Sequence, residues 1–437
     1  MARRKRHAPL AVYLNSRLVG QLRKAASGAV DFQYDDSWLS WEDTFPISLS
    51  LPLREDRYIG APVIAVFDNL LPDNPDIRRK LAERARADGT DAFNLLSAIG
   101  RDCVGALQFL PEDIAPGPPG GIDARPVSDD EIAALLGDLG NSPLGIGADE
   151  EFRISLAGAQ EKTALLHWKD QWHIPHGTTA TTHIFKPEIG KRPDGIDLSL
   201  SVENEHLCMT LMNALGLPAA ETAITRFGNR KVLVVKRFDR LWTTDKRLLR
   251  LPQEDCCQAL SVPPARKYES DGGPGLAGLI GLFTSSDTPL EDQRRIMKAA
   301  IVFWLLAATD GHAKNFSLFL YPRSRFSLTP FYDVMSVQPL YDAKQLQQRQ
   351  MKMAMAIGKS RHYLVHRIAP RHFLETAEAC GMGKNIVQEL FAELLDRSDK
   401  AIDKTLAALP SGFPHGLTES IIGGYHRRLR QLEAIIT

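Results

Sequence analysis

Three polar side chains around one short apolar stretch have the types and spacing of a phosphoryl-transfer site. Asp310 ends a long apolar run, Asn315 follows five residues later, and Asp333 lies eighteen residues beyond Asn315 in T-P-F-Y-D. In such sites one carboxylate orients the attacking hydroxyl, while an amide and a second carboxylate hold magnesium on nucleotide phosphates. We therefore predict that Asp310 is the catalytic residue and that Asn315 and Asp333 are metal ligands. A helix end capped by Gly311 would explain Asp-Gly alone, but not all three groups.

Two lysines and one small-residue loop are candidates for phosphate binding. Residues 155–162 read S-L-A-G-A-Q-E-K between two strand-like runs, and small residues let backbone N–H groups approach phosphate oxygens. The Walker A pattern is absent, and an ordinary hairpin turn is an alternative. Lys186 ends the strand-like T-H-I-F-K-P, where kinase folds place the lysine that binds the α- and β-phosphates. An ordinary surface lysine is the alternative there.

Other residues could complete a nucleotide site. The apolar strand 232–240 ends in K-R-F-D-R, and the backbone of Lys236, Arg237 and Phe238 could meet the edge of an adenine ring. A central strand with an exposed end is equally consistent with this pattern. Between Asp310 and Asn315, His312 and Lys314 could contact phosphates, although His312 could equally be a structural hydrogen-bonding residue.

Hydrophobic periodicity predicts the elements that carry these residues. Residues 8–22 alternate about Asn15 and Ser16, which predicts a hairpin, and strand character continues to about Leu53. Helices are predicted from Asp73 or Asn74 and over 91–100, followed by a returning strand.

The Pro- and Gly-rich segment 111–127 predicts an exposed linker or domain edge. From about residue 152 strand-like segments dominate around one helix that stops at Gly216, and after about residue 285 the chain is mostly helical. We predict two domains, an N-terminal α/β domain over 1–145 and a catalytic domain with a helical C-terminal half over 146–437.

Composition is that of an ordinary globular protein. The 437 residues include 53 Lys and Arg against 53 Asp and Glu, so net charge neither demands nor excludes a nucleic-acid partner. Five scattered cysteines without a C-x-x-C pair argue against a disulfide framework or a structural zinc site. The longest apolar run is too short to span a bilayer, so we expect a cytoplasmic protein with no membrane association.

Several long strings of the sequence resemble the HipA family of serine/threonine-kinase toxins from bacterial toxin–antitoxin systems. They include F-D-N-L-L-P-D, L-L-S-A-I-G-R-D-C-V-G-A, F-R-I-S-L-A-G-A-Q-E-K-T-A-L-L, L-R-L-P-Q-E-D, K-Y-E-S-D-G-G-P-G, A-T-D-G-H-A-K-N-F-S and L-T-P-F-Y-D. The resemblance implies an α/β (α+β) fold with a eukaryotic-protein-kinase-like core, similar also to phosphatidylinositol kinases. It implies ATP and Mg²⁺ as cofactors and Ser155 as a site of autophosphorylation in trans. The nucleotide contacts it implies, together with those proposed above, are Ala157, Gly158, Ala159, Gln160, Glu161, Lys162, Lys186, Lys236, Arg237, Phe238, His312, Ala313, Lys314, Asn315, Tyr332 and Asp333.

The resemblance also implies partners. These are a HipB-like helix-turn-helix antitoxin, operator DNA reached mainly through that antitoxin, a dimeric state within the complex, and glutamyl-tRNA synthetase as the protein substrate whose modification arrests growth and favours persistence. Bound to antitoxin and DNA, the protein would be nucleoid-associated and act as a co-repressor. The basic residues with which the family contacts DNA align near Glu378 and Gly381, and neither is basic here. Lys384 and the basic segment 359–372 are the other candidates for that contact.

Two other functions are consistent with the same residues. One is a small-molecule kinase of the same fold, and the other is a DNA-bound co-repressor with weak kinase activity. The presence of Asp310, Asn315, Asp333, Lys186 and Ser155 together favours an active protein-serine kinase, an ATP:protein phosphotransferase.

Overall fold

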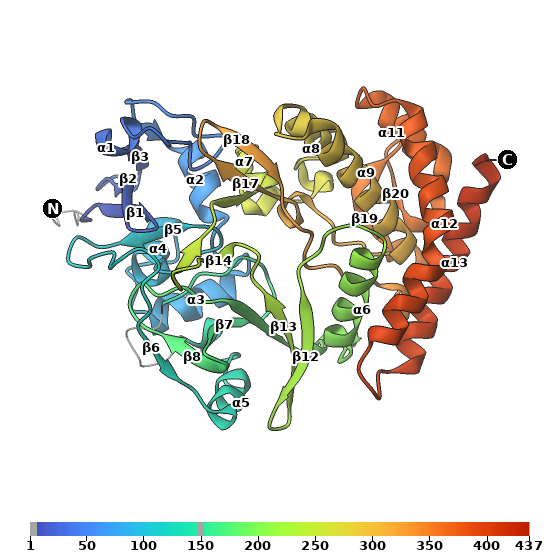
Figure 1. Cartoon of the computed structure of the whole chain (residues 1–437), viewed down its shortest axis with the longest axis horizontal. Coiled ribbons are helices and arrows are strands. Elements are labelled where there is room, and N and C mark those ends of the chain that lie inside the picture. The colour runs from blue at the N-terminus through green and yellow to red at the C-terminus, as the bar shows by residue number, and fades with distance from the viewer. Residues whose placement is uncertain (1–6, 147–152, 437) are drawn as a thin grey trace.

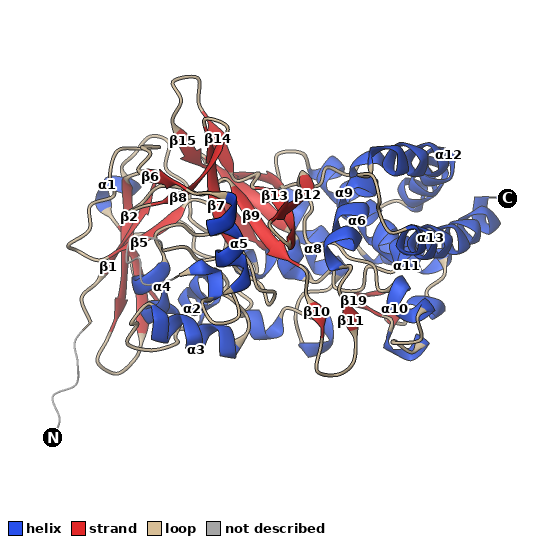
Figure 2. Cartoon of the chain, turned by 90° about the horizontal axis from the view of Figure 1, so that it is seen from below, coloured by secondary structure: helices blue, strands red, loops and turns tan. Residues whose placement is uncertain are grey.

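The computed structural model describes residues 7–146 and 153–436, and it contains both sheets and helices. Sheets occupy the N-terminal side of the molecule, and long helices form the C-terminal end (Figures 1 and 2). Most buried apolar side chains form one cluster with members from Leu10 to Leu432, and Leu166, Ala180 and Leu248 form a second, small cluster. In the described part of the chain, no helix is both long and apolar enough to cross a membrane.

The N-terminal sheet is antiparallel, with the strand order β4-β3-β2-β1-β5. The predicted hairpin is confirmed, because β1 and β2 pair across Asn15 and Ser16, which both have positive φ as a tight hairpin turn requires. The elements here are β1 (Leu10–Leu14), β2 (Arg17–Lys24), β3 (Val30–Tyr34), α1 (Asp36–Leu39), β4 (Tyr58–Ile59), α2 (Ala61–Asp68), α3 (Pro75–Arg84), α4 (Ala92–Ile99) and β5 (Leu107–Leu110). Helix α3 begins after Asn74, whose side chain accepts from the backbone N–H of Asp76, as the sequence predicted.

The strand expected over residues 47–53 is wrong. This segment forms turns and bends, although its alternating apolar residues resemble a strand. The Ser50 hydroxyl donates to the Gln258 carbonyl at 2.8 Å, and the Leu49 N–H donates to the Glu254 carboxylate at 2.8 Å. Side chains and distant backbone thus take the hydrogen bonds that a strand partner would otherwise supply.

Because Glu254 is buried, its carboxyl should make the free energy of unfolding depend on pH. Burial raises the pKa of its carboxyl from 4.5 to about 8. The folded chain therefore keeps a proton that the unfolded chain loses, so the free energy of unfolding should fall as pH rises from 4.5 to 8. Glu254→Gln should remove a slope of up to about 1.4 kcal/mol per pH unit in that window. Urea unfolding at pH 5 and pH 8 measures it, with exposed Glu112→Gln as the control; equal slopes in the Glu254 variant and wild type would contradict the assignment.

The second sheet carries the segments predicted to bind nucleotide. Its strand order is β12-β13-β9-β7-β8-β6, and every pairing is antiparallel. Its strands are β6 (Ala124–Pro126), β7 (Thr163–Trp168), β8 (Gln171–Pro175), β9 (His183–Pro187), β12 (Thr222–Phe227) and β13 (Arg230–Lys236), and α6 (Ser201–Ala214) contacts β12 and β13. Because β6 pairs with β8, the end of the expected linker 111–127 is part of this sheet. Helix α5 (Asp129–Gly137) starts at a capping box between Ser128 and Glu131.

The C-terminal part combines a small sheet, β16-β17-β18, with the long helices. Helix α9 (Pro289–Leu306) packs on α13 (His415–Ile436), and α12 (Lys384–Ala408) contacts α6, α9, α11 (Pro370–Ala379) and α13 (Figure 1). The smaller elements are β10 (Gly190–Lys191), β11 (Asp197–Leu198), β14 (Arg240–Trp242), β15 (Leu248–Arg250), β16 (Gln253–Asp255), α7 (Cys256–Ala259), α8 (Leu276–Leu282), β17 (Ser317–Tyr321), β18 (Arg325–Leu328), α10 (Gln338–Asp342), β19 (Lys352–Ile357) and β20 (His362–Leu364).

Candidate active site

The segment after α9 brings the three predicted chemical groups together. Helix α9 ends at Leu306, and Ala307 adopts a left-handed conformation, so Gly311 does not cap it. A short 3-10 turn then carries Asn315, whose Nδ2 donates to the Asp310 carbonyl at 2.9 Å. Asp310, Asn315 and Asp333 line one small cavity. The turn therefore brings Asn315 close to Asp310, and the β17–β18 hairpin returns the chain so that Asp333 lies near both.

Lys186 on β9 reaches this cavity from the second sheet. Its ammonium lies 2.8 Å from the Asp333 carboxylate and 2.7 Å from that of Glu205 on α6. Burial alone would lower the pKa of Lys186, but the two carboxylates outweigh it and raise the pKa. Burial alone would likewise raise the pKa of Asp333, but Lys186 and Lys162 hold it well below its usual range. Sequence reasoning missed Glu205, although a helix following the lysine strand is where kinases place the lysine's ion-pair partner.

The loop over residues 155–162 closes against the same site. Lys162 is buried and donates to the Ala157 carbonyl at 2.5 Å, and burial together with neighbouring Lys186 lowers its pKa to about 8. Gly158 has a φ of +109°, and a Cβ there would lie 2.5 Å from Nζ of Lys162, so this position requires glycine. Elsewhere in the loop, Gln160 donates to the Pro187 carbonyl, and Ala159 and Glu161 are exposed.

Ser155 opens this loop and is fully buried. Its hydroxyl donates to the Leu70 carbonyl at 2.8 Å, and its N–H donates to the Asp102 carbonyl at 2.9 Å. The Asp73 N–H in turn donates to the Gly158 carbonyl at 3.1 Å. The N-terminal segments around α3 and α4 therefore hold the loop in place.

The segment 236–238 lies beside the site, but many of its hydrogen-bonding and charged groups already have partners within the protein. The Lys236 ammonium is exposed and pairs with Glu221, and the Lys236 N–H donates to the Glu221 carbonyl. The Arg237 N–H donates to the Thr182 carbonyl at 2.9 Å, and its guanidinium is buried. Phe238 packs against Tyr332, with ring centroids 5.8 Å apart.

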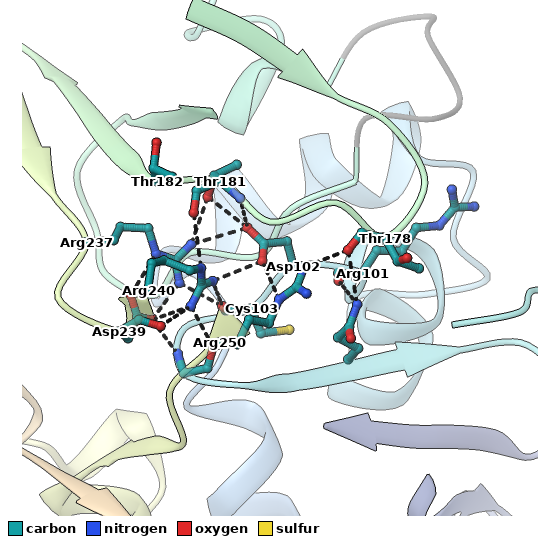
Figure 3. Close-up of polar contacts among 12 residues, drawn as sticks. Arg101, Asp102, Cys103, Thr178, Thr181, Thr182, Arg237, Asp239, Arg240 and Arg250 are labelled. Carbon is teal, nitrogen blue, oxygen red and sulfur yellow. Dashed lines mark hydrogen bonds and ion pairs between the residues drawn. The ribbon is translucent and has the colours of Figure 1, made fainter. Parts of the chain in front are cut away.

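Arg237 belongs to a buried network around Asp102 (Figure 3). The Asp102 carboxylate contacts the guanidinium groups of Arg237, Arg240 and Arg250 at 2.9–3.3 Å. Asp239 bonds Arg237 at 2.7 Å and Arg240 at 3.0 Å. Asp102 follows α4, whereas Arg237 follows β13, Arg240 begins β14 and Arg250 ends β15, so this network ties the N-terminal part to the second sheet and the β14–β15 hairpin. The spacing of the sequence did not indicate it.

His312, Ala313 and Lys314 lie between Asp310 and Asn315, and all three are buried. Lys314 and Lys267 both pair with Asp73, at 2.5 and 2.8 Å. Burial and nearby Lys267 lower the pKa of His312 to about 3, which makes it a neutral ring at physiological pH. The Tyr332 hydroxyl donates to the Lys314 carbonyl at 2.8 Å and lies 2.6 Å from the Ser317 hydroxyl. These two contacts hold the segment between Asp310 and Ser317 in place.

Tyr268 contacts the predicted catalytic carboxylate directly. Its hydroxyl donates to Asp310 Oδ1 at 2.6 Å, and its ring packs edge-on against His312 with centroids 4.9 Å apart. Burial raises the pKa of Asp310, whereas the donated hydrogen bond lowers it. Tyr268 is thus a positioning residue that also favours the ionised carboxylate, and it lies in the segment K-Y-E-S-D-G-G-P-G.

Tyr268→Phe should therefore change both rate and pH dependence. We expect kcat to fall about tenfold, the effect of losing one hydrogen bond to a charged group. The pKa of Asp310 should rise, so the acidic limb of the kcat profile should move to higher pH. A pH–rate profile tests this, with Tyr341→Phe as the control on the exposed side of α10. An unshifted acidic limb would exclude this role for Tyr268.

The donor atoms present fit a magnesium ion held partly by nucleotide phosphates. In the described residues, no three His, Cys, Asp or Glu side chains form a metal site by themselves. The Asn315 amide is fixed through Nδ2, which leaves its oxygen as a ligand atom, and Asp333 adds a carboxylate that is 36% exposed. One or two protein oxygens with phosphates and water are the usual ligands of Mg²⁺ in nucleotide sites.

Two protein-family models match this chain, one in its N-terminal part and one in its C-terminal part. Residues 10–110 match the HipA N-terminal domain, and residues 154–402 match the HipA-like C-terminal domain. The chain belongs to the HipA family. Among relatives, Y4mE of Sinorhizobium fredii, which bears the name of a kinase, is 34% identical over 91% of each chain. The serine/threonine-protein kinase toxin HipA of Shewanella oneidensis is 28% identical over 92% of this chain and 90% of its own.

A solved structure is similar over almost the whole HipA-family chain. It is the Shewanella oneidensis complex of HipA, HipB and operator DNA, with a TM-score of 0.80, 26% identity and 97% coverage of both chains. The predicted family and mixed α/β fold are therefore confirmed. Near the positions expected to contact DNA, Glu378 pairs with Lys359 at 3.0 Å and with Lys384 at 3.2 Å. Lys384 and the first lysine of the segment 359–372 thus share one acidic partner, and both ammonium groups stay exposed.

Proposed function

We propose that this HipA-family protein is an ATP- and Mg²⁺-dependent serine/threonine-protein kinase that acts as a toxin. One observation carries the proposal: Asp310, Asn315 and Asp333 line one cavity, and Lys186 pairs with both Asp333 and Glu205 beside it. Protein kinases need such a lysine–glutamate pair together with a carboxylate for magnesium.

Each residue has a distinct part in the transfer. Asp310 accepts a hydrogen bond from the serine or threonine hydroxyl and aligns it with the γ-phosphate. Lys186 holds the α- and β-phosphates, and it turns from Asp333 toward them when nucleotide enters. Magnesium, when bound by Asn315 and Asp333, supplies neutralisation of the phosphate charge. The loop 155–162, with Ser155 and Lys162 buried at its two ends, offers backbone N–H groups to the phosphates.

Ser155 is the proposed site of inactivating autophosphorylation. A phosphate adds about two negative charges, and the site of Ser155 is fully buried against the Leu70 carbonyl. No phosphate fits there without breaking that hydrogen bond, so modification requires the loop to leave its place. Expulsion removes Lys162 and the backbone donors from the nucleotide site and silences the kinase.

Incubation with ATP and Mg²⁺ tests both proposals. Mass spectrometry should find phosphate on Ser155 in the wild-type chain, and Ser155→Ala should remain unmodified and active. The purified phosphorylated chain should bind ATP at least about tenfold more weakly, since it loses more than one charge-assisted contact. If phosphorylated and unmodified chains bound ATP equally, the switch would be refuted. If neither chain transferred phosphate to any protein, the kinase proposal would fail.

The partners are proposed from the same family membership. They are a HipB-like helix-turn-helix antitoxin, a dimeric assembly with it on operator DNA, and glutamyl-tRNA synthetase as the target whose phosphorylation arrests growth. The similar Shewanella oneidensis complex of HipA with HipB and operator DNA supports the antitoxin and the DNA as partners. In this proposal operator DNA is reached mainly through the antitoxin, since neither Glu378 nor Gly381 is basic. In this proposal the protein acts in the cytoplasm and joins the nucleoid as a co-repressor.

A further inference from the structure

A second, larger cleft opens at Asp310 on the side formed by β19 and β20. Its volume is about 670 Å³, and it shares Asp310 with the small cavity that also contains Asn315 and Asp333. Its walls are Tyr268, the start of β19, the segment 360–364 and Arg367. A cleft of this size accommodates several residues of an extended chain or a ligand of similar volume.

The walls of this cleft are positively charged. Lys352, Arg361, His362 and Arg367 line it, and Asp310 is the one carboxylate among the lining residues. Arg361 is already paired with Glu269 at 3.1 Å, and the second oxygen of Glu269 accepts from the Ala356 N–H. Arg361 therefore does not account for the excess charge.

Lys352 and Arg367 remain as uncompensated cations. Both are exposed, and within the described residues no carboxylate lies at ion-pair distance from either side chain. Most exposed ammonium and guanidinium groups are simply solvated, but these two face a cleft that ends at the catalytic carboxylate. A ligand in the cleft would bring its own charges against them while its hydroxyl approaches Asp310.

We infer that this cleft seats the acceptor segment of the protein substrate, and that Lys352 and Arg367 select segments with acidic residues beside the acceptor serine or threonine. This inference rests on the proposed kinase function and adds the charge of the substrate segment. The cations compensate carboxylates of the incoming chain, and they also offset the repulsion that Asp310 would exert on an acidic segment. Tyr268 and Met353 supply apolar wall surface for the backbone between those charges.

The ligand of this cleft is a protein segment because Asp310 lies at the end of the cleft. An acceptor hydroxyl has to reach Asp310, and a serine or threonine side chain on an extended backbone presents one at its tip. A nucleic acid would instead place a phosphate near the Asp310 carboxylate whenever its sugar hydroxyl approached. Such binding is the alternative outcome that the experiment must detect.

Three matched serine peptides distinguish these possibilities. One carries Asp and Glu around the serine, the second carries Asn and Gln at those positions, and the third carries Lys and Arg. With wild-type protein, kcat/KM should be about tenfold higher for the acidic than for the neutral peptide, since one charge-assisted hydrogen bond changes an equilibrium by roughly that factor. The double variant Lys352→Ala/Arg367→Ala should lose this preference while it retains turnover of the neutral peptide. The control Lys400→Ala/Lys404→Ala, on the exposed side of α12, should keep the preference.

Binding of the same peptides with serine replaced by alanine, followed by fluorescence anisotropy, separates the cleft from catalysis. Tighter binding of the acidic peptide, weakened in the double variant, supports the inference even where turnover is absent. Equal binding and equal kcat/KM of acidic and neutral peptides would overturn the inference and leave the kinase proposal standing. Tighter binding of the basic peptide, or of a labelled single-stranded RNA that releases in the double variant, would also overturn it. Loss of all phosphoryl transfer with acidic-peptide binding intact would instead refute the proposed function.

Discussion

Replacing Asp310 with asparagine is expected to lower kcat by about 10²–10⁴-fold, the usual contribution of a positioned acid–base group. Asparagine keeps the shape of the side chain and can still accept from Tyr268, so the loop should fold normally. It cannot carry the negative charge that attracts and orients the hydroxyl proton of the acceptor. The KM for ATP should change little, because Lys186, Asn315 and Asp333 remain.

Single-turnover phosphoryl transfer to a serine peptide measures this effect, and ATP binding by calorimetry shows that the site is still formed. Asp271→Asn is a matched control, because Asp271 is exposed in the same loop as Tyr268. Expression without antitoxin gives a second measurement, since the Asp310 variant should no longer arrest growth. If transfer by the Asp310 variant stayed within about threefold of wild type, its effect would be smaller than any general acid–base role requires.

The groups close together in the sequence were the ones that could be predicted from it. The offset between Asp310 and Asn315 is set by a single turn, so the spacing along the chain largely decides the spacing in space. The hairpin at Asn15 and Ser16 and the helix start at Asn74 are similarly local, because turn and capping preferences act over a few residues. Lys186 was located through the strand that carries it.

Contacts between distant segments could not be predicted in this way. Tyr268 meets Asp310 across 42 positions, and Asp73 meets Lys314 across 241. No periodicity records such pairs, because each partner only has to lie at the end of a loop that the whole fold brings into place. The error at residues 47–53 has the same origin, since Glu254 and Gln258, more than 200 positions away, satisfy that segment's polar groups.

Asp102→Asn should be the most destabilising of the substitutions considered, lowering the free energy of unfolding by about 3–5 kcal/mol. Asp102 is 1% exposed, and burial alone would raise its pKa, but Arg240, Arg250 and Arg237 hold that pKa well below its usual range. With Asp239 it compensates two of the three buried guanidinium charges. Asparagine preserves the volume and the acceptor for the Thr181 N–H, but it leaves two cations uncompensated in the interior.

Urea unfolding followed by tryptophan fluorescence measures the loss, with Asp113→Asn in the exposed 111–127 segment as the control. Removing a cation as well should restore part of the stability, so Asp102→Asn/Arg250→Met should be more stable than the sum of the single variants predicts. Additive effects in this cycle, or a loss below about 1 kcal/mol, would mean that the arginines find solvent when Asp102 is neutral.

Asp102→Asn should also weaken ATP binding at the proposed nucleotide site. Arg237 is held between Asp102 and Asp239, and its backbone N–H fixes the segment 236–238 to Thr182. At temperatures where the variant remains folded, the KM for ATP should therefore rise while the dependence of kcat on Asp310 is retained. The N-terminal segment would then contribute to nucleotide binding through a buried carboxylate that holds Arg237 in place.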